Sequence, residues 1–282
     1  MLPEGFQFNQ ASLQDFVECR RRFQYRYLER LAWPALETEP YHEFERLTEL
    51  GSKFHQLIHQ YFIGINPETI RKQIHDPELN IWWQRFLAYA QSLPDVNRTE
   101  EIGIHPERIL VAPISKTSVV VKYDLLVIYP DGKCTIYDWK TSQKPPNRDW
   151  LADRMQTILY PFMLVHSDHT AIGWSEIEPE NVEMVYWYAN NPEAPIKFSY
   201  SHDKYKEDRE VLGVLIDLIN QLAPEDYWLT EDHKRCRYCV YRSLCNRGDV
   251  AGEFKDLEEI PDVISEFGQD VIDNNLVNGI VT

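Results

Sequence analysis

The sequence predicts a mixed α/β fold, in which a mixed β-sheet is flanked by helices. Two observations lead to this prediction. The N-terminal third carries apolar side chains at helical spacing, whereas the middle of the chain contains short segments rich in Val, Ile and Tyr. Helix and strand patterns then alternate toward the C-terminus. A chain of 282 residues is long enough for one domain with insertions or for two small domains.

Three helices are predicted ahead of the sheet. The first takes Ser12 as its N-cap, with Asp15 three residues later. Thr48 caps the second helix, which carries Phe54 on an apolar stripe. Pro94 ends the third helix. The three predicted helices span residues 9–30, 48–62 and 77–93.

Five strands and two further helices complete the pattern. Pro130-Asp131-Gly132 is a hairpin signal, so the second and third strands should be antiparallel neighbours. In the helix that follows them, Pro161 should cause a kink or an interruption. The predicted strands are 108–114, 118–129, 133–140, 182–189 and 196–200, and the predicted helices are 149–166 and 203–222.

The formal net charge of −16 argues at face value against a nucleic-acid partner, because phosphate binding needs a basic surface. The charge is uneven, however. Residues 251–282 hold eight acids against Lys255 alone, and residues 20–30 hold five arginines against Glu29. The sequence therefore predicts a folded domain over residues 1–250 with an acidic tail over 251–282, and it allows a DNA contact that is confined to a groove.

Other features of the composition favour a globular protein of the cytoplasm. Hydrophobic residues make up 43% of the chain and aromatic residues 13%, which excludes a wholly disordered chain. No apolar run approaches the roughly 18 residues that a bilayer span requires. The start, MLPEGFQFNQ, lacks the basic and apolar regions of a signal peptide. We therefore expect a soluble, cytoplasmic protein with no membrane partner.

The chain has five cysteines, and a disulfide framework is not expected in a chain that is not a small secreted one. Cys236, Cys239 and Cys245 form a C-x2-C-x5-C pattern, whose thiolates can converge on one metal centre. A fourth ligand must come from elsewhere, with Cys19 and Cys134 as the candidates. An iron–sulfur cluster, a zinc ion and cysteines that merely pack in the core are the alternatives.

The stretch KYDLLVIYPDGKCTIYDWKTS contains Asp124 in one predicted strand and Asp138-Trp139-Lys140 in the next. The two-residue period of a strand puts Asp138 and Lys140 on one face, and the hairpin allows Asp124 to approach Asp138. Carboxylates buried in apolar strands need a partner, and Mg2+ or Mn2+ prefers such oxygen ligands. The lysine could then position or deprotonate a water for attack on a phosphodiester. A surface ladder of salt bridges is the alternative.

Two predicted helices add polar residues to this set. Gln156 and Tyr160 are four residues apart and therefore share a helix face. His55 lies beside the apolar stripe of helix 48–62. With His59 it forms H-x3-H, a spacing that can hold zinc but that here lacks an obvious third ligand.

Two charged segments allow alternative interpretations. The arginine-rich segment 20–30 also contains Phe23, Tyr25 and Tyr27, an arrangement that suits phosphates and bases. A solvated helix face is the alternative for this segment. The acidic tail is typical of a solvated chain end. A second hypothesis is that the tail docks on the basic groove.

In their order, these motifs resemble those of the RecB-like branch of the PD-(D/E)XK nuclease superfamily. The matching motifs are Gly51-Ser52-Lys53-Phe54-His55, Asp124, Asp138-Trp139-Lys140-Thr141 and Gln156-Thr157-Ile158-Leu159-Tyr160. Cys19 with the following arginines, together with the C-terminal cysteines, is similar to the iron–sulfur subset of these nucleases. That subset includes the CRISPR-associated RecB-like exonucleases and the AddB-type nuclease domain. The resemblance spans residues 12–248.

The resemblance implies a restriction-endonuclease-like fold and a role for each matching residue. Lys140 would be the catalytic lysine, and Gln156 and Tyr160 would orient the lysine or the DNA backbone. The ligands of Mg2+ or Mn2+ would be His55, Asp124, Asp138 and the backbone carbonyl of Trp139. The substrate would be DNA, either single-stranded or at ends, and the partners could be CRISPR adaptation or repair proteins.

The resemblance also implies a [4Fe–4S] cluster that ties the N- and C-terminal segments together. This selects Cys19 over Cys134, and the implied ligands are Cys19, Cys236, Cys239 and Cys245. The chain departs from the family pattern where Val121-Lys122-Tyr123 stands in place of a frequent glycine. The family also often has an acidic residue in the preceding strand, for which Glu101 and Glu107 are the candidates.

Different functions remain open on the sequence. The leading hypothesis is a metal-dependent DNA exonuclease that acts on single strands or ends and carries a [4Fe–4S] cluster. A non-catalytic DNA-binding or scaffold module is the second, although such a module has no need of Asp124, Asp138 and Lys140 together. A zinc-stapled nuclease is the third. The P-loop pattern is absent, so a helicase–nuclease fusion is not expected.

Overall fold

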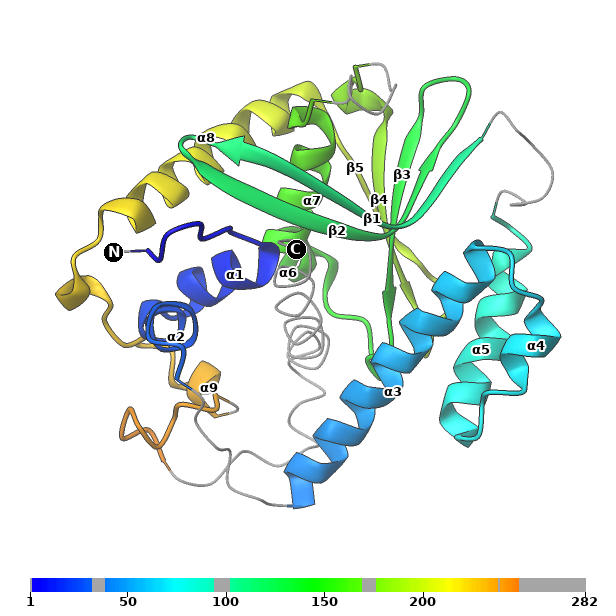
Figure 1. The fold of residues 1–282 in the computed structure, drawn as a ribbon, viewed down its shortest axis with the longest axis horizontal. Helices are drawn as coiled ribbons and strands as arrows, with labels where there is room; N and C mark the ends of the chain where they lie inside the picture. Colours follow the sequence, from blue (N-terminus) through cyan, green and yellow to red (C-terminus); the bar gives the residue numbers. More distant parts are fainter. Residues whose placement is uncertain (1, 32–38, 94–101, 169–175, 238, 249–282) are drawn as a thin grey trace.

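The computed structural model describes residues 2–31, 39–93, 102–168, 176–237 and 239–248, and a five-stranded sheet lies at its centre (Figure 1). In their order across the sheet, the strands are β1 (Gly103–Ile114), β2 (Thr117–Ile128), β3 (Cys134–Lys140), β4 (Val182–Tyr188) and β5 (Ile196–Ser199). Neighbouring strands are antiparallel, except that β3 and β4 are parallel. The predicted mixed sheet with flanking helices is therefore confirmed.

Helices cover both faces of the sheet (Figure 1). One face is covered by α3 (Glu39–Phe62) and α5 (Pro77–Ala90), and the other by α7 (Met155–His166) together with α1 (Gln10–Glu18) and α8 (His202–Gln221). In the described part of the chain, four short helices complete the set: α2 (Arg20–Phe23), α4 (Pro67–Arg71), α6 (Arg148–Ala152) and α9 (His233–Cys236). Within the described ranges, no helix is both long and apolar enough to cross a membrane.

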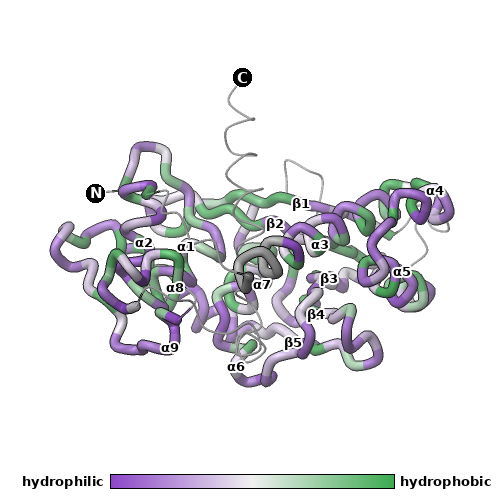
Figure 2. Tube along the Cα trace, turned by 90° about the horizontal axis from the view of Figure 1, so that it is seen from below, coloured by the Kyte–Doolittle hydropathy of each residue, from purple (hydrophilic) through white to green (hydrophobic). Residues whose placement is uncertain are grey.

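The two faces of the sheet bury different cores. Under α3 and α5, the rings of Phe54 and Phe86 pack against Trp139 of β3 and Trp187 of β4. The core under α7 contains more aliphatic side chains and also extends to α1 and α8. Figure 2 shows apolar segments along β1, whereas the segment around α9 is hydrophilic. The sheet is thus buried on both sides, and any polar side chain inside it needs a partner.

One partly buried carboxylate ties three distant parts of the chain together. The Glu18 side chain, at the end of α1, forms ion pairs with Arg22 at 2.6 Å, with Arg235 of α9 at 2.6 Å, and with Arg154 just before α7. Burial alone would raise the pKa of Glu18, but the three arginines outweigh it and lower this pKa to about 2. The network therefore holds the N-terminal helices, α7 and the C-terminal segment against one another.

The first predicted helix is not continuous, and its predicted N-cap is wrong. Asn9 is the N-cap: its side chain accepts the Ser12 N–H at 2.8 Å, and its own N–H donates to the Ser12 hydroxyl at 3.0 Å. The chain leaves helical geometry at Cys19, where φ is −161° and ψ is 105°. It then continues as α2 and a π-helical turn over Gln24–Leu28. This break brings Arg22 within 2.6 Å of both Asp15 and Glu18.

The boundaries of the second and third helices also differ from the prediction. Helix α3 begins at Glu39 rather than at Thr48. Pro40 lies in its first turn, where the missing N–H needs no partner inside the helix, so the helix can start this early. Helix α5 ends at Ala90, before the predicted end at residue 93. Residues 94–101 and the tail 251–282 lie outside the described residues.

The predicted interruption at Pro161 is wrong, because α7 runs through this proline. The chain is interrupted earlier, at Arg154, whose extended backbone (φ −76°, ψ 142°) separates α6 from α7. At this break the Thr157 hydroxyl donates to the Leu151 carbonyl at 2.6 Å. A side chain therefore satisfies a carbonyl that the continuous helix would have paired.

Substituting the aromatic core should have a large effect on stability, in contrast to substitution on the outer face of the same helix. Phe86→Ala removes a fully buried ring from α5 and should lower the free energy of unfolding by about 3–5 kcal/mol. Ile81→Ala, on the same helix at a position that is 49% exposed, is the matched control and should cost less than about 1 kcal/mol. Urea unfolding measures both, and equal costs would contradict the assigned core.

Candidate active site

A buried polar triangle lies where β3 meets α7. Asp138 and Lys140 share one face of β3, and the Lys140 Nζ lies 3.0 Å from the Asp138 Oδ2. Gln156, the second residue of α7, joins both of them. Its Nε2 donates to the Asp138 Oδ1 at 2.6 Å, and its Oε1 accepts from the Lys140 Nζ at 3.0 Å. All three side chains are buried, so the triangle holds the lysine ammonium in one position.

Asp124 of β2 lies beside this triangle, because the register that pairs Leu125 with Tyr137 brings it next to Asp138. The Trp139 N–H donates to its Oδ2 at 2.8 Å. Its other oxygen, Oδ1, lies 3.2 Å from Nδ1 of His55 on α3. Asp124 is therefore held from the sheet on one side and from the covering helix on the other.

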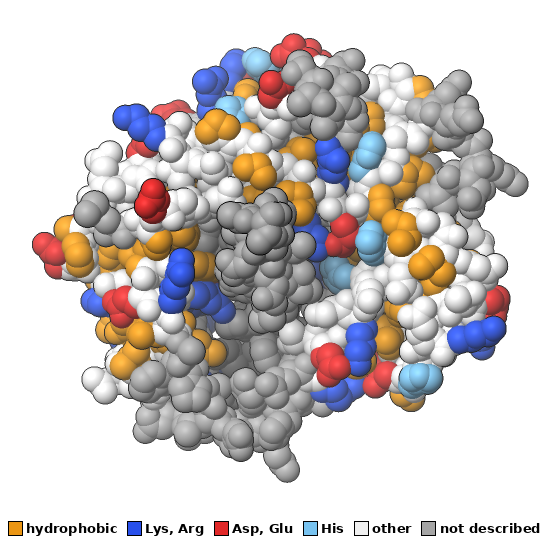
Figure 3. Space-filling view, viewed as in Figure 1, with side chains coloured by type: hydrophobic (Ala, Val, Ile, Leu, Met, Phe, Trp, Pro, Cys, Tyr) orange, Lys and Arg blue, Asp and Glu red, His pale blue; other side chains and the backbone are white. Residues whose placement is uncertain are grey.

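Glu107 of β1 completes a group of candidate metal ligands. One ligand atom from each of His55, Glu107 and Asp124 lies within 4.8 Å of the other two. Glu107 also forms an ion pair with Lys122 on β2. In Figure 3, histidine, acidic and basic side chains lie together near the middle of the visible face. The structure thus adds an acidic residue from the preceding strand to the predicted set.

The strand pair β1–β2 is distorted at this point. Tyr123 faces the core under α7 and Leu125 faces the core under α3, although residues two apart on a regular strand share one face. The change falls at Asp124 and Glu107, which lie opposite each other without a ladder pair between them. Glu107 has a φ of 54°, a left-handed conformation that costs a non-glycine residue about 1 kcal/mol or more. The strain therefore lies where the two carboxylates meet His55.

Helix α3 approaches the end of β3 closely at Gly51. A Cβ at this position would lie 3.2 Å from the Oγ1 of Thr141, which is tighter than an ordinary van der Waals contact. Glycine therefore allows the helix to lie against the residue that follows Lys140. His55 is four residues further along the same helix face, so the close approach also sets the distance between His55 and Asp124.

Burial and the neighbouring charges shift the proton affinities of the group. Burial raises the pKa of Asp138 to about 6; Lys140 opposes this rise and Asp124 adds to it. Burial alone would also raise the pKa of Asp124, but His55 and the Trp139 N–H outweigh it and lower this pKa. For His55 burial works in the opposite direction, and the Asp124 carboxylate raises the pKa above its usual value. His55 and Asp138 therefore both retain protons to higher pH than usual.

These donors fit a divalent cation. His55, Glu107 and Asp124 would hold it, with the Asp138 carboxylate adjacent. The Asp138 Oδ2 is buried and its partner is the Lys140 ammonium rather than a hydrogen-bond donor from the backbone. Carboxylates suit Mg2+, and Mn2+ also accepts an imidazole. His59, the second histidine of the H-x3-H pattern, is not part of the group found in the described chain.

Five of the predicted site residues come together in this region: His55, Asp124, Asp138, Lys140 and Gln156. Tyr160 lies one turn beyond Gln156. Its ring centroid is 5.3 Å from that of Tyr123, and its carbonyl accepts the Tyr123 hydroxyl at 2.9 Å. The Trp139 side chain packs in the aromatic core on the opposite face. The roles of Tyr160 and of the Trp139 carbonyl stay predictions.

The length of the β1–β2 turn is a sequence signal that could have placed Glu107 in the site. β1 and β2 are joined by a tight hairpin at Ser115-Lys116, and Ser115 has a φ of 54°. A two-residue loop at this position fixes a register in which Glu107 stands opposite Asp124. Glu101, the other acidic candidate, lies outside the described residues.

The predicted iron–sulfur ligands come from the two tied ends of the chain. Burial raises the pKa of the Cys236 and Cys239 thiols, and Cys19 adds to both shifts. Burial also raises the pKa of Cys245 to about 11, again with a contribution from Cys19. In the described part of the chain, however, no three thiols lie within 4.8 Å of one another. The cysteines are neighbours without forming the tight group that one metal ion requires.

The arginine-rich segment is less available for phosphates than the sequence suggests. Arg22 and Arg26 both form ion pairs with the buried Asp15, at 2.6 and 2.8 Å. Phe23 is fully buried. Arg20 stacks on Trp228, with 4.1 Å from its Cζ to the ring centroid. Much of this segment therefore belongs to the packing between the two chain ends.

Metal binding should release protons, and its affinity should fall as the pH falls. Because His55 and Asp138 hold protons to higher pH than usual, protons compete with the cation most strongly below about pH 6. Titration calorimetry with Mn2+ at pH 6 and pH 8, in buffers of different ionisation enthalpy, measures both effects. His59→Gln on the same helix is the control and should keep them. An affinity for Mn2+ that does not change with pH would contradict the assignment of this group as the metal site.

Glu107→Gln should weaken binding of Mn2+ by about 10-fold to 100-fold, because it removes one charged ligand and leaves the fold intact. Glu193→Gln, at an exposed loop position, is the control for a loss of one acidic charge. The same calorimetric titration measures both variants. If both bind Mn2+ as the unaltered protein does, Glu107 is not a ligand.

Comparisons with known proteins identify the family of this chain. The sequence profile of the PD-(D/E)XK nuclease superfamily matches residues 7–246. Among solved structures, the protein SSO0001 is similar over 87% of this chain and 87% of its own, with 15% identity and a TM-score of 0.41. A candidate exonuclease from Eubacterium rectale is similar over 76% of this chain and 80% of its own, with 9% identity and a TM-score of 0.48. No curated protein matches. Because the family profile covers most of its length, the chain belongs to the PD-(D/E)XK nuclease superfamily.

Proposed function

We propose that this protein is a metal-dependent deoxyribonuclease that hydrolyses phosphodiester bonds of single-stranded DNA or of DNA ends. The observation that carries the proposal is the buried contact between Asp138 and Lys140. This contact lies beside Asp124, which with His55 and Glu107 forms the group of candidate metal ligands. Burying these charges inside the sheet lowers the stability of the fold, and binding a ligand is a reason to keep them there. Family membership supports the class of reaction, and the preference for single strands or ends is a prediction from the RecB-like resemblance.

The side chains of the site have separate roles in the proposed reaction. A bound Mg2+ or Mn2+ would supply Lewis-acid chemistry and make a bound water more acidic. His55, Glu107 and Asp124 would hold this cation. Asp138 and Gln156 hold the Lys140 ammonium, which can orient the attacking water or offset negative charge that develops on the phosphate. Because Gln156 touches both Lys140 and Asp138, it acts as a positioning residue.

The second candidate function is a DNA-binding or scaffold module that keeps the nuclease fold. Such a module would gain nothing from a lysine ammonium buried between a carboxylate and an amide. The complete set of His55, Asp124, Asp138 and Lys140 therefore favours the enzyme. The same reasoning supports a nuclease domain over residues 1–250. CRISPR adaptation or DNA-repair proteins are the partners that the resemblance suggests.

We further infer a [4Fe–4S] cluster on Cys19, Cys236, Cys239 and Cys245. Burial raises the pKa of the Cys236, Cys239 and Cys245 thiols, so a cationic centre would be needed to hold these three as thiolates. Four cysteine ligands suit either a zinc ion or a [4Fe–4S] cluster, and the resemblance to the iron–sulfur subset of these nucleases is what favours the cluster.

Lys140→Ala should lower nuclease activity by at least about 100-fold while leaving the fold unchanged. The assay uses labelled single- and double-stranded DNA with Mg2+ or Mn2+. Lys133→Ala removes a lysine that is 69% exposed in the β2–β3 turn, and it serves as the matched control with near-normal activity. If the unaltered protein and Lys140→Ala are equally inert on every substrate, the nuclease proposal fails and the scaffold is favoured.

Cys245→Ser should abolish a broad visible absorbance and most of the bound iron of anaerobically purified protein. Cys134→Ser is the matched control, because Cys134 is buried at the start of β3 and lies outside the proposed ligand set. Iron and zinc analysis, together with the absorption spectrum, measures both variants. Colourless unaltered protein with one zinc per chain would favour the zinc-stapled alternative, and equal iron in the two variants would exclude Cys245 as a ligand.

A further inference from the structure

A buried tyrosine ring lies beside the Lys140 ammonium. Tyr186 of β4 is fully buried, and the parallel pairing of β3 with β4 places it next to Asp138. The Lys140 Nζ lies 5.7 Å from the centroid of this ring, within the range over which an aromatic face attracts a cation. The ring of Phe198 on β5 packs against it at an angle of 88°, which limits its movement. The ammonium therefore has an aromatic neighbour in addition to Asp138 and Gln156.

The hydroxyl of Tyr186 contacts the first turn of α7. Its oxygen lies 2.8 Å from the Oγ1 of Thr157, the residue that directly follows Gln156. The Thr157 hydroxyl has one hydrogen, which it donates to the Leu151 carbonyl at 2.6 Å. The Tyr186 hydroxyl must therefore be the donor to Thr157. One tyrosine thus contacts Lys140 through its ring and the neighbour of Gln156 through its hydroxyl.

The first turn of α7 depends on side chains to hold it. The backbone is extended at Arg154, so the helix starts only at Met155, and the first N–H groups of a helix have no helical partner. Pro161 lies inside the helix without an N–H, so the helical hydrogen bond to the Thr157 carbonyl is missing. Contacts from outside the helix must therefore set the position of this turn.

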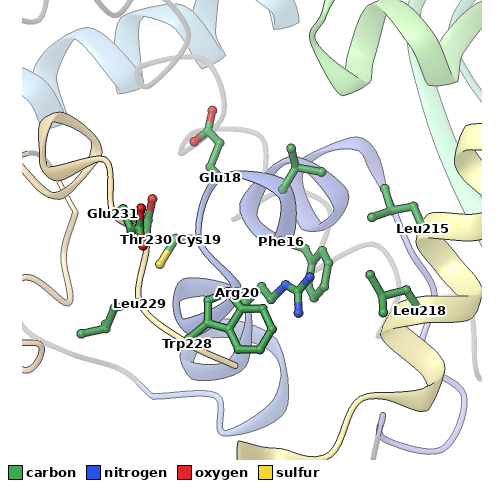
Figure 4. A pocket seen from close by; sticks show the side chains of 11 residues that line it. Phe16, Glu18, Cys19, Arg20, Leu215, Leu218, Trp228, Leu229, Thr230 and Glu231 are labelled. Carbon is green, nitrogen blue, oxygen red and sulfur yellow. The ribbon is translucent and has the colours of Figure 1, made fainter. Parts of the chain in front are cut away.

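Contacts from α1 hold the residues just before Gln156. The Gln14 side chain accepts the Met155 N–H at 2.9 Å, and Glu18 forms its ion pair with Arg154. Figure 4 shows Glu18 at the end of α1, among the residues that line a cavity. The residue that follows Gln156 is held by the hydroxyl of the β4 tyrosine instead. The backbone of α7 is thus anchored on both sides of the glutamine that touches the lysine.

We propose that Tyr186 is a positioning residue for Lys140. Its ring supports the ammonium, and its hydroxyl, through Thr157, fixes the turn of α7 that presents Gln156. The proposal rests on the proposed function, because it takes Lys140 as the lysine of the nuclease reaction. Tyr186 acts through these neighbours, since it is fully buried and its hydroxyl is donated to Thr157. Its removal should therefore disturb the reaction more than the binding of DNA.

Labelling of lysines by an acetylating ester tests this positioning in the full chain without DNA. Lys140 is 4% exposed and should react slowly, and Lys133, which is 69% exposed, is the internal reference. Tyr186→Phe removes only the hydroxyl and should raise the labelling rate of Lys140 by about fivefold, the change in population that loss of one buried hydrogen bond produces. Tyr186→Leu, which also removes the ring, should raise it further. Adding Tyr186→Phe to Thr157→Val should have no further effect, because both remove the same hydrogen bond.

Tyr200→Phe is the matched control. It removes another buried tyrosine hydroxyl from the same core, one that donates to Asp208 at 3.0 Å. It should lower the midpoint of urea unfolding by an amount similar to that of Tyr186→Phe, but leave Lys140 labelling and DNA cleavage unchanged. In the nuclease assay, Tyr186→Phe should lower kcat by about tenfold at an unchanged KM, because a displaced lysine weakens the reaction step.

Three results would overturn the proposal. They are an unchanged labelling rate of Lys140 in Tyr186→Phe, an equal rise of that rate in Tyr200→Phe, and a normal kcat of Tyr186→Phe in an active nuclease. Failure of the proposed function would look different. If the unaltered protein cleaves no DNA but Lys140 labelling still responds to Tyr186→Phe, the nuclease proposal fails while the positioning of Lys140 by Tyr186 stands.

Discussion

The fold of this protein has to offset the free-energy cost of burying the charges of Asp124, Asp138 and Lys140. These side chains lie inside a sheet that helices cover on both faces. Each charge has a specific counterpart: the Trp139 N–H and His55 for Asp124, and Gln156 and Lys140 for Asp138. These counterparts come from β3, α3 and α7. Both helix layers must therefore pack correctly before the charges can be buried, which couples the geometry of the site to the whole fold.

Two other features provide the rigidity that this burial requires. The aromatic core holds α3 and α5 on the sheet, and Gly51 lets α3 come close enough to present His55. On the other side, Glu18 pairs with the nearby Arg22 and with Arg154 and Arg235 from two distant segments, and it fixes the start of α7, where Gln156 lies. Residues far from the site in sequence thus determine whether Lys140 is held in position. This agrees with the general need for rigid support around a reactive group.

The site also stores strain. The left-handed conformation of Glu107 and the change of face at Asp124 interrupt an otherwise regular pair of strands. Such a distortion weakens the sheet locally, yet it occurs where two carboxylates and an imidazole converge. Strained backbone at the point of ligand convergence is typical of functional sites in enzymes. The proposed cluster ligands, in contrast, come from the two tied ends of the chain.

The sequence by itself determined the mixed α/β class, the β2–β3 hairpin and most of the charged site residues, because strand periodicity and turn residues are local signals. It did not predict the features that depend on contacts between residues far apart in the sequence. The break at Cys19 brings Arg22 to Asp15 and Glu18, and the chain is interrupted at Arg154 rather than at Pro161. Glu107 joined the site only through the register of β1 against β2. Much of the arginine-rich segment lost its expected role because its charges are used inside the molecule, and only the tertiary structure determines which charges remain open to a ligand.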